Sequence, residues 1–182
     1  MSHSHEYETS EGSNGATEVS LHASSQLLQA IDQMMQVEQP SDMTAGYFAN
    51  MAEVLKDQGQ DLAGLIATGA ALGSIRENHY LRGTLMDSVI NSELADDEKV
   101  IVETISNDVA RLSTQVGNSD EVERYLLESI GSVYSSPQCD SRLRALLASM
   151  QAGLVHTENG KQYIASTFQS ALYAVTEKPQ KV

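Results

Sequence analysis

Apolar residues recur along most of this chain at intervals of three and four positions, which is the spacing of one face of an α-helix. This pattern predicts seven helices joined by short polar linkers. The expected helices cover about residues 19–37, 41–59, 62–94, 96–117, 119–133, 137–154 and 161–176. We therefore expect an all-α fold, a compact bundle of about six to seven amphipathic helices.

The longest uncharged and mainly apolar run, residues 62–75, lies between Asp61 and Arg76. At about 1.5 Å per residue this run extends roughly 21 Å, which is short of the roughly 30 Å hydrocarbon core of a bilayer. It is therefore expected to be a buried core helix, with insertion into a membrane as the alternative. A helix continuing to residue 94 would be exceptionally long, so a break near residues 78–83 is plausible.

Small residues mark one face of this central run. Gly69 and Gly73 are four positions apart, and Leu65 and Leu72 lie on the same face. A glycine inside a helix costs about 1 kcal/mol relative to alanine, so a compensating contact is expected there. A pair of small residues spaced in this way lets another backbone approach closely. We predict that a helix of this chain or of a second copy comes closest at these four residues.

A chain of 182 residues is long enough for one domain with a proper hydrophobic core. Residues 1–18 have little apolar content and are expected to form a flexible acidic tail. Residues 19–178 are expected to form a single helical domain, followed by the C-terminal end at 179–182. The chain shows no internal repeat and no coiled-coil heptad run. A small hairpin turning at Asn159–Gly160 is the competing interpretation of residues 154–165.

The formal net charge of −14 argues against direct binding of nucleic acids or anionic lipid surfaces. The charge is unevenly distributed, because no lysine or arginine precedes Lys56 whereas eight carboxylates do. An acidic first third suits docking on a basic partner surface.

The single cysteine, Cys139, cannot form an internal disulfide. The N-terminal residues lack the basic and apolar regions of a secretory signal peptide. We expect a cytoplasmic location, or export without a cleavable signal peptide, for example in a secretion system or virion.

Motifs for phosphate-binding loops, dinucleotide binding, serine hydrolases, zinc proteases and calcium loops are missing from the sequence. The only nucleophile to weigh is Cys139, with His79 or His156 as its base. Cys139 also falls on the apolar stripe expected for residues 137–154, which favours a buried and inert thiol. We expect no catalytic residue, no cofactor and no metal site.

Arg76, His79 and Arg82 form the only basic-leaning stretch of the central segment. If one helix holds all three, their side chains share adjacent parts of one surface and form a possible contact patch for acidic groups. Arg142 and Arg144 make a similar small cluster. Ion pairing within the chain is the competing explanation for both groups.

These features favour a non-enzymatic helical interaction or assembly protein. A structural subunit, an adaptor or an assembly chaperone of a larger microbial or viral machine would fit, with a protein partner or self-association. One alternative is an acidic inhibitor that mimics nucleic acid against a basic partner. The other is a secreted, membrane-active protein that uses residues 62–75.

Overall fold

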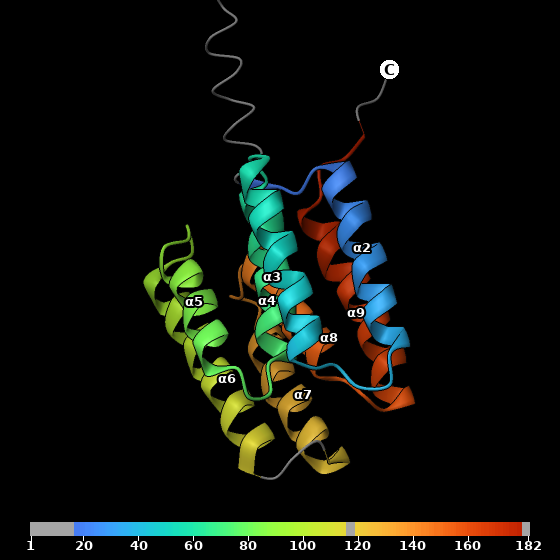
Figure 1. Cartoon of the computed structure of the whole chain (residues 1–182). Helices are drawn as coiled ribbons and strands as arrows, with labels where there is room; N and C mark the ends of the chain where they lie inside the picture. Colours follow the sequence, from blue (N-terminus) through green and yellow to red (C-terminus); the bar gives the residue numbers. More distant parts are fainter. Residues whose placement is uncertain (1–16, 116–118, 180–182) are drawn as a thin grey trace, which may run out of the picture.

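The computed structural model describes residues 17–115 and 119–179, and eight α-helices make up most of these ranges (Figure 1). The fold is all-α, as the apolar pattern predicts. The described ranges contain no strand, only an isolated parallel bridge between Val19 and Thr176. Residues 1–16 of the expected tail and residues 180–182 of the C-terminal end lie outside the described part. The helices are α2 (Leu21–Gln36), α3 (Asp42–Asp57), α4 (Asp61–Ser74), α5 (His79–Ile90), α6 (Asp96–Gln115), α7 (Asp120–Tyr134), α8 (Ser141–Leu154) and α9 (Glu158–Val175).

The count exceeds the predicted seven because the long third helix is divided into α4 and α5. The chain becomes extended at Ile75, and the side chain of Asn78 then caps α5 by accepting a hydrogen bond from Leu81 N at 3.0 Å. The break therefore lies just before the region in which it was expected. Gly83, at the end of that region, lies inside α5.

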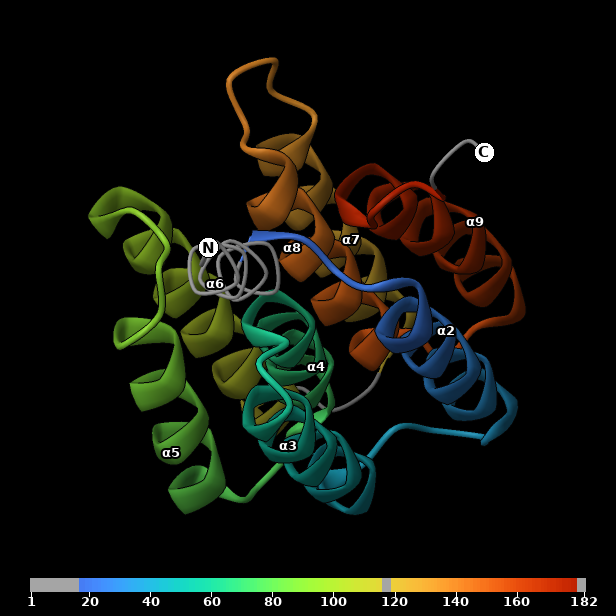
Figure 2. The same ribbon diagram turned by 90° about the horizontal axis from the view of Figure 1, so that it is seen from above.

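Helices α4 and α8 lie at the centre, and the other helices surround them (Figure 2). All residues of α4 from Leu62 to Ser74 are buried, and so are those of α8 from Ala145 to Leu154. Consecutive helices alternate in direction along the chain, so α4 and α8 run parallel to each other (Figure 1). The prediction that residues 62–75 form a buried core helix is therefore confirmed. No helix of the described chain has the length and apolarity needed to cross a bilayer.

Glycines set the distance between the two central helices. A Cβ atom on Gly69 would lie 2.8 Å from the carbonyl oxygen of Leu146, and one on Gly73 would collide with the carbonyl oxygen of Met150. From the other side, a Cβ atom on Gly153 would lie 2.5 Å from the carbonyl oxygen of Ala70. The close approach expected at Gly69 and Gly73 is thus made by α8 of the same chain.

The bundle consists of two similar halves, α2–α5 and α6–α9, related by an approximate two-fold axis between α4 and α8 (Figure 2). Helix α2 contacts α8 and α9 of the second half, and α6 correspondingly contacts α4 and α5 of the first. Gly73 and Gly153 are 80 positions apart and meet across this axis. The halves thus resemble each other in the arrangement of their helices, although the sequence shows no internal repeat.

A short sequence signature accompanies the repeat at the start of α3 and of α7. Ser41 and Ser119 are the N-caps, an aspartate follows each, and Tyr47 and Tyr125 come six residues after the caps. Each aspartate reaches the linker that follows the central helix of its own half. Asp42 Oδ1 accepts from Arg76 N at 2.7 Å, and Asp120 Oδ1 lies 3.1 Å from His156 Nε2. So few shared positions make the repeat hard to detect in the sequence.

Two predicted helix boundaries near the C-terminus are wrong. Pro137 and Cys139 precede α8, which begins at Ser141 because Asp140 caps it and accepts from Arg142 N at 2.7 Å. Helix α9 begins at Glu158, because Thr157 Oγ1 accepts from Gly160 N at 3.0 Å. Asn159–Gly160 therefore lies in the first helical turn, and the alternative hairpin does not form.

We expect Gly73→Ala to destabilise the fold by about 2 kcal/mol or more, because the new methyl group meets the rigid backbone of α8. Gly83→Ala is the matched control, since no atom lies within 4 Å of its Cβ position. The control should stabilise the protein by roughly 0.5–1 kcal/mol through helix propensity. Urea unfolding of both variants measures the difference. Equal effects of the two substitutions would contradict the close approach.

Candidate binding pocket at one end of the bundle

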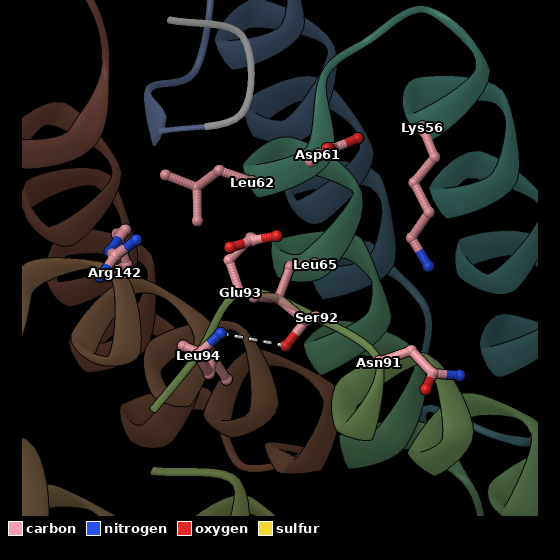
Figure 3. A pocket seen from close by; sticks show the side chains of 9 residues that line it. All are labelled: Lys56, Asp61, Leu62, Leu65, Asn91, Ser92, Glu93, Leu94 and Arg142. Atoms are coloured by element: carbon pink, nitrogen blue, oxygen red, sulfur yellow. Dashed lines mark hydrogen bonds between the residues drawn. The ribbon is translucent and has the colours of Figure 1, made fainter. Parts of the chain in front are cut away.

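A cavity of about 220 Å³ opens at the end of the bundle where α4 and α8 begin (Figure 3). Four separate parts of the chain form it: the last turn of α3, the first turns of α4, the linker between α5 and α6, and the first turn of α8. The lining residues are Lys56, Asp61, Leu62, Leu65, Asn91, Ser92, Glu93, Leu94 and Arg142.

The floor of the pocket is apolar. Leu62 and Leu65 are on the first turns of α4, and Leu94 comes from the α5–α6 linker. All three are at most 6% exposed, so they belong to the hydrophobic core as well as to the pocket. The floor is therefore held rigidly by the packing of the bundle.

Lys56 is positioned by the tight connection between α3 and α4. Gly59 adopts a φ of 79°, a left-handed conformation that ends α3 and suits glycine best, and Gln60 N donates to Leu55 O at 2.9 Å. A Cβ atom on Gly64 would lie 2.7 Å from Lys56 Cγ, so the lysine stem lies across this glycine. The ammonium group is thereby directed to one side of the cavity (Figure 3).

The α5–α6 linker supplies the near edge of the pocket. Asn91 ends α5 and its backbone N–H donates to Asp87 O at 3.0 Å. Ser92 Oγ donates to Val89 O at 2.6 Å and accepts from Leu94 N at 3.4 Å, which turns the chain inward. Glu93 is left exposed on this turn and lies between Arg142 and Lys56 (Figure 3).

Arg142 lies on the side opposite Lys56 and is held by Asp140 (Figure 3). Its Nε donates to Asp140 Oδ1 at 3.2 Å. This side-chain hydrogen bond is the main cause that lowers the pKa of Asp140, and it raises the pKa of Arg142. Both groups therefore stay charged over a wide range of pH.

The arrangement suits a small amphipathic group. Cofactor and drug-sized ligands occupy sites of roughly 300–1,000 Å³, so a cavity of about 220 Å³ is too small for most of them. Among the described residues, the side chains of Lys56, Asp61 and Glu93 make no hydrogen bond or ion pair. An apolar group of a ligand can lie between the leucines, and charged or polar groups next to it on the same ligand can contact the rim.

The structure distributes the predicted site residues over different environments. Leu65 lines the pocket, whereas Leu72 is 1% exposed and lies in the core. Gly69 and Gly73 are also buried, so the groove that they form is filled by α8 and is not open to a second copy.

The predicted basic patch is not formed as expected, because the break between α4 and α5 separates its members. Arg76 turns back over the end of α4, where its Nη1 donates to Gly73 O at 2.9 Å, and burial lowers its pKa. His79 is exposed at the start of α5, and Arg82 bonds Asn107 Oδ1 of α6 at 2.9 Å. The other pair also separates, since Arg144 Nε donates to Tyr134 O at 3.0 Å and does not line the pocket.

The alternative thiol dyad is wrong. Cys139 precedes α8 and His156 follows it, so a helix of 14 residues, roughly 21 Å, separates them. His79 begins α5 just after the end of α4, also at the end of the bundle away from Cys139. Burial is the first cause that raises the pKa of the Cys139 thiol.

His156 belongs instead to a clasp between α7 and the linker before α9. Its Nδ1 lies 3.1 Å from Glu123 Oε1, and its Nε2 lies 3.1 Å from Asp120 Oδ1. Glu123 is buried and also accepts from His156 N at 2.5 Å and Thr157 N at 3.1 Å. These polar groups satisfy one another, which indicates a structural role. The described residues contain no group of three or more His, Cys, Asp or Glu side chains that could hold a metal ion.

Sequence reasoning did not identify the end pocket. Its charged members are separated by up to 86 positions, from Lys56 to Arg142, and no spacing rule connects them. No protein-family model, curated protein or solved structure matches this chain. Its function is therefore inferred from its own geometry.

We expect Asp140→Asn to lower stability at neutral pH, because asparagine still caps α8 but loses the charge that pairs with Arg142. The folded-state pKa of Asp140 is lowered, so its charge stabilises the fold above the unfolded pKa of about 3.9. This stabilisation is lost as the pH falls below that value and through the folded-state pKa. The difference between wild type and variant should therefore stay nearly constant from neutral pH down to about pH 5 and shrink as the pH falls below about 4. Urea unfolding at a series of pH values tests this, and a difference that stays constant over the whole series would contradict it.

We expect iodoacetamide to modify Cys139 more slowly at neutral pH than it modifies a free cysteine. The raised pKa leaves less thiolate, which is the reactive form. The alkylation rate should still be rising above about pH 8.5, the ordinary pKa of a thiol. Mass spectrometry of quenched samples measures the rate. A plateau below that pH would indicate an activated thiol.

Proposed function

We propose that this chain is a non-catalytic interaction or assembly protein whose end pocket receives an apolar side chain of a protein partner. The observation that carries the proposal is the combination of an apolar floor with a charged rim, in which three described side chains make no hydrogen bond or ion pair. The floor of leucines offers a desolvated anchor site, and Lys56, Asp61 and Glu93 surround it. Binding sites between proteins are commonly organised in this way, with a buried anchor inside a polar rim.

The outer surface supports the same proposal. Five of the six tyrosines in the described part are exposed, on α3, α5, α7 and α9, whereas both phenylalanines are buried. Tyrosine is enriched at protein interfaces because its ring is apolar and its hydroxyl group hydrogen-bonds. The exposed tyrosines are Tyr47, Tyr80, Tyr125, Tyr163 and Tyr173.

A photo-crosslinking residue at Asn91, on the rim, tests the proposal in the cells that normally make this protein. Asn50, an exposed asparagine on α3, provides the matched control position. We expect one discrete partner to crosslink from position 91 and not from position 50. Equal crosslinking from both positions would argue against a specific pocket.

The partner identified in this way can then be titrated against purified variants. Asn91→Trp should place a large ring over the cavity and weaken binding about tenfold or more, a loss of about 1.4 kcal/mol. Asn50→Trp should bind as the wild type does. Unchanged affinity of the Asn91→Trp variant, with its fold verified by circular dichroism, would refute the proposal.

A further inference from the structure

Helices α7 and α9 both pack on α8 (Figure 2). A second concave surface lies between α7 and α9. One cavity of about 750 Å³ contains Leu127, Gly131 and Tyr163 in its lining, and a further one of about 560 Å³ continues along α9 past Ser166 and Ser170. Ser135 lines both cavities, so they are adjacent, and we refer to the two together as the α7–α9 groove. None of its lining residues belongs to the end pocket.

The groove exists because the two halves of the bundle pack differently. In the first half Gly64 lets α3 approach α4, and a Cβ atom there would lie 3.0 Å from Ala52 O. The position 80 residues later is Arg144, whose Nε instead bonds Tyr134 O at 3.0 Å. Large side chains thus separate α7 from α8.

Gln151 fills the space that this separation leaves. Its Oε1 accepts from Tyr134 Oη at 2.8 Å, and its Nε2 donates to Leu127 O at 2.9 Å. Burial, and then the nearby Tyr163, raise the pKa of Tyr134 to about 12. The phenol therefore stays protonated and keeps this bond, so the floor of the groove is fixed by an internal polar network and does not collapse.

The dimensions of the groove suit an α-helix. Helix α7 has 15 residues and therefore extends roughly 22 Å, about four helical turns. The wall on α7 is built of small residues, Gly131, Ser132 and Ser135, which let another backbone approach. A Cβ atom on Gly131 would meet only Gln151 Nε2, at an ordinary van der Waals distance of 3.8 Å, so no backbone of this chain is packed against this glycine.

The charge of the groove and of the chain indicates which kind of helix would bind there. The larger cavity is lined by the exposed carboxylates of Asp120 and Glu128 and by the exposed cation Arg124, and Asp120 keeps one oxygen for a partner because only its Oδ1 contacts His156. The smaller cavity adds Arg144, whose Nε donates to Tyr134 O. The chain from residue 93 to residue 128 contains ten carboxylates and three cations, which are Lys99, Arg111 and Arg124. A second copy of this chain, with its net charge of −14, would be repelled, whereas a basic segment would be attracted.

We propose that the α7–α9 groove binds a basic amphipathic helix of a partner protein. The apolar face of that helix packs against Leu127, Gly131 and Tyr163, and its lysines or arginines meet Asp120 and Glu128. This is the helix-in-groove mode of recognition, with electrostatic attraction favouring basic over acidic helices.

A synthetic peptide of about 18 residues, long enough to form an isolated helix, serves as the probe. It carries leucine on one helical face and lysine on the other. A second peptide has glutamate in place of each lysine. Titration of the isotope-labelled full chain, followed by amide chemical shifts, should locate the lysine peptide on α7 and α9. Binding should weaken with added salt, and the glutamate peptide should not bind.

Gly131→Leu fills the groove and should weaken binding about tenfold or more. Gly83→Leu, on α5, is the control, since no atom lies within 4 Å of its Cβ position and it is outside the groove, and it should bind as the wild type does. Glu128→Lys should weaken binding and reduce its salt dependence. Circular dichroism verifies that each variant is folded. Chemical-shift changes confined to other helices, or an unchanged affinity of the Gly131→Leu variant, would overturn this proposal. Neither result would contradict the function proposed for the end pocket.

Discussion

The parallel packing of α4 against α8 is the constraint on which the rest of the bundle depends. Three glycines, Gly69, Gly73 and Gly153, bring the two backbones so close that a Cβ atom on any of them would lie within 3 Å of a backbone atom of the other helix. Each glycine costs helix propensity, and the dispersion attraction between the closely packed helices offsets that cost. Because these two helices are almost wholly buried, the other six are arranged around them and provide nearly all of the surface.

Comparison of the two halves shows where the surface of one half differs from that of the other. In each half, the aspartate that follows the N-cap serine of α3 or α7 contacts the linker after the central helix. They differ where Gly64 in the first half corresponds to Arg144 in the second, and there α7 is separated from α8 by polar side chains. Gly64 also shapes the end pocket, because the aliphatic stem of Lys56 lies across it. A single glycine position thus influences both candidate binding surfaces.

The fold class and most helices could be predicted because apolar periodicity can be recognised within each segment of the sequence, without knowledge of its tertiary contacts. The errors occurred where one side chain decides a boundary. Asp140, not Pro137, begins α8, and Thr157 begins α9 in spite of the Asn159–Gly160 turn signal. The end pocket could not be predicted, since four distant segments form it and no local pattern connects them. The repeat was detectable in principle from the serine, aspartate and tyrosine shared by α3 and α7.

The acidity of the chain has a different meaning at the two surfaces. The end pocket is lined by two cations, Lys56 and Arg142, and by two carboxylates, Asp61 and Glu93, so the charge of its rim is balanced. In the larger cavity of the α7–α9 groove the carboxylates outnumber the cations, and this excess is the basis for proposing a basic helix as its ligand. Salt screens long-range attraction more than it affects a desolvated apolar anchor. Under the two proposals, binding at the α7–α9 groove should therefore weaken more with added salt than binding at the end pocket.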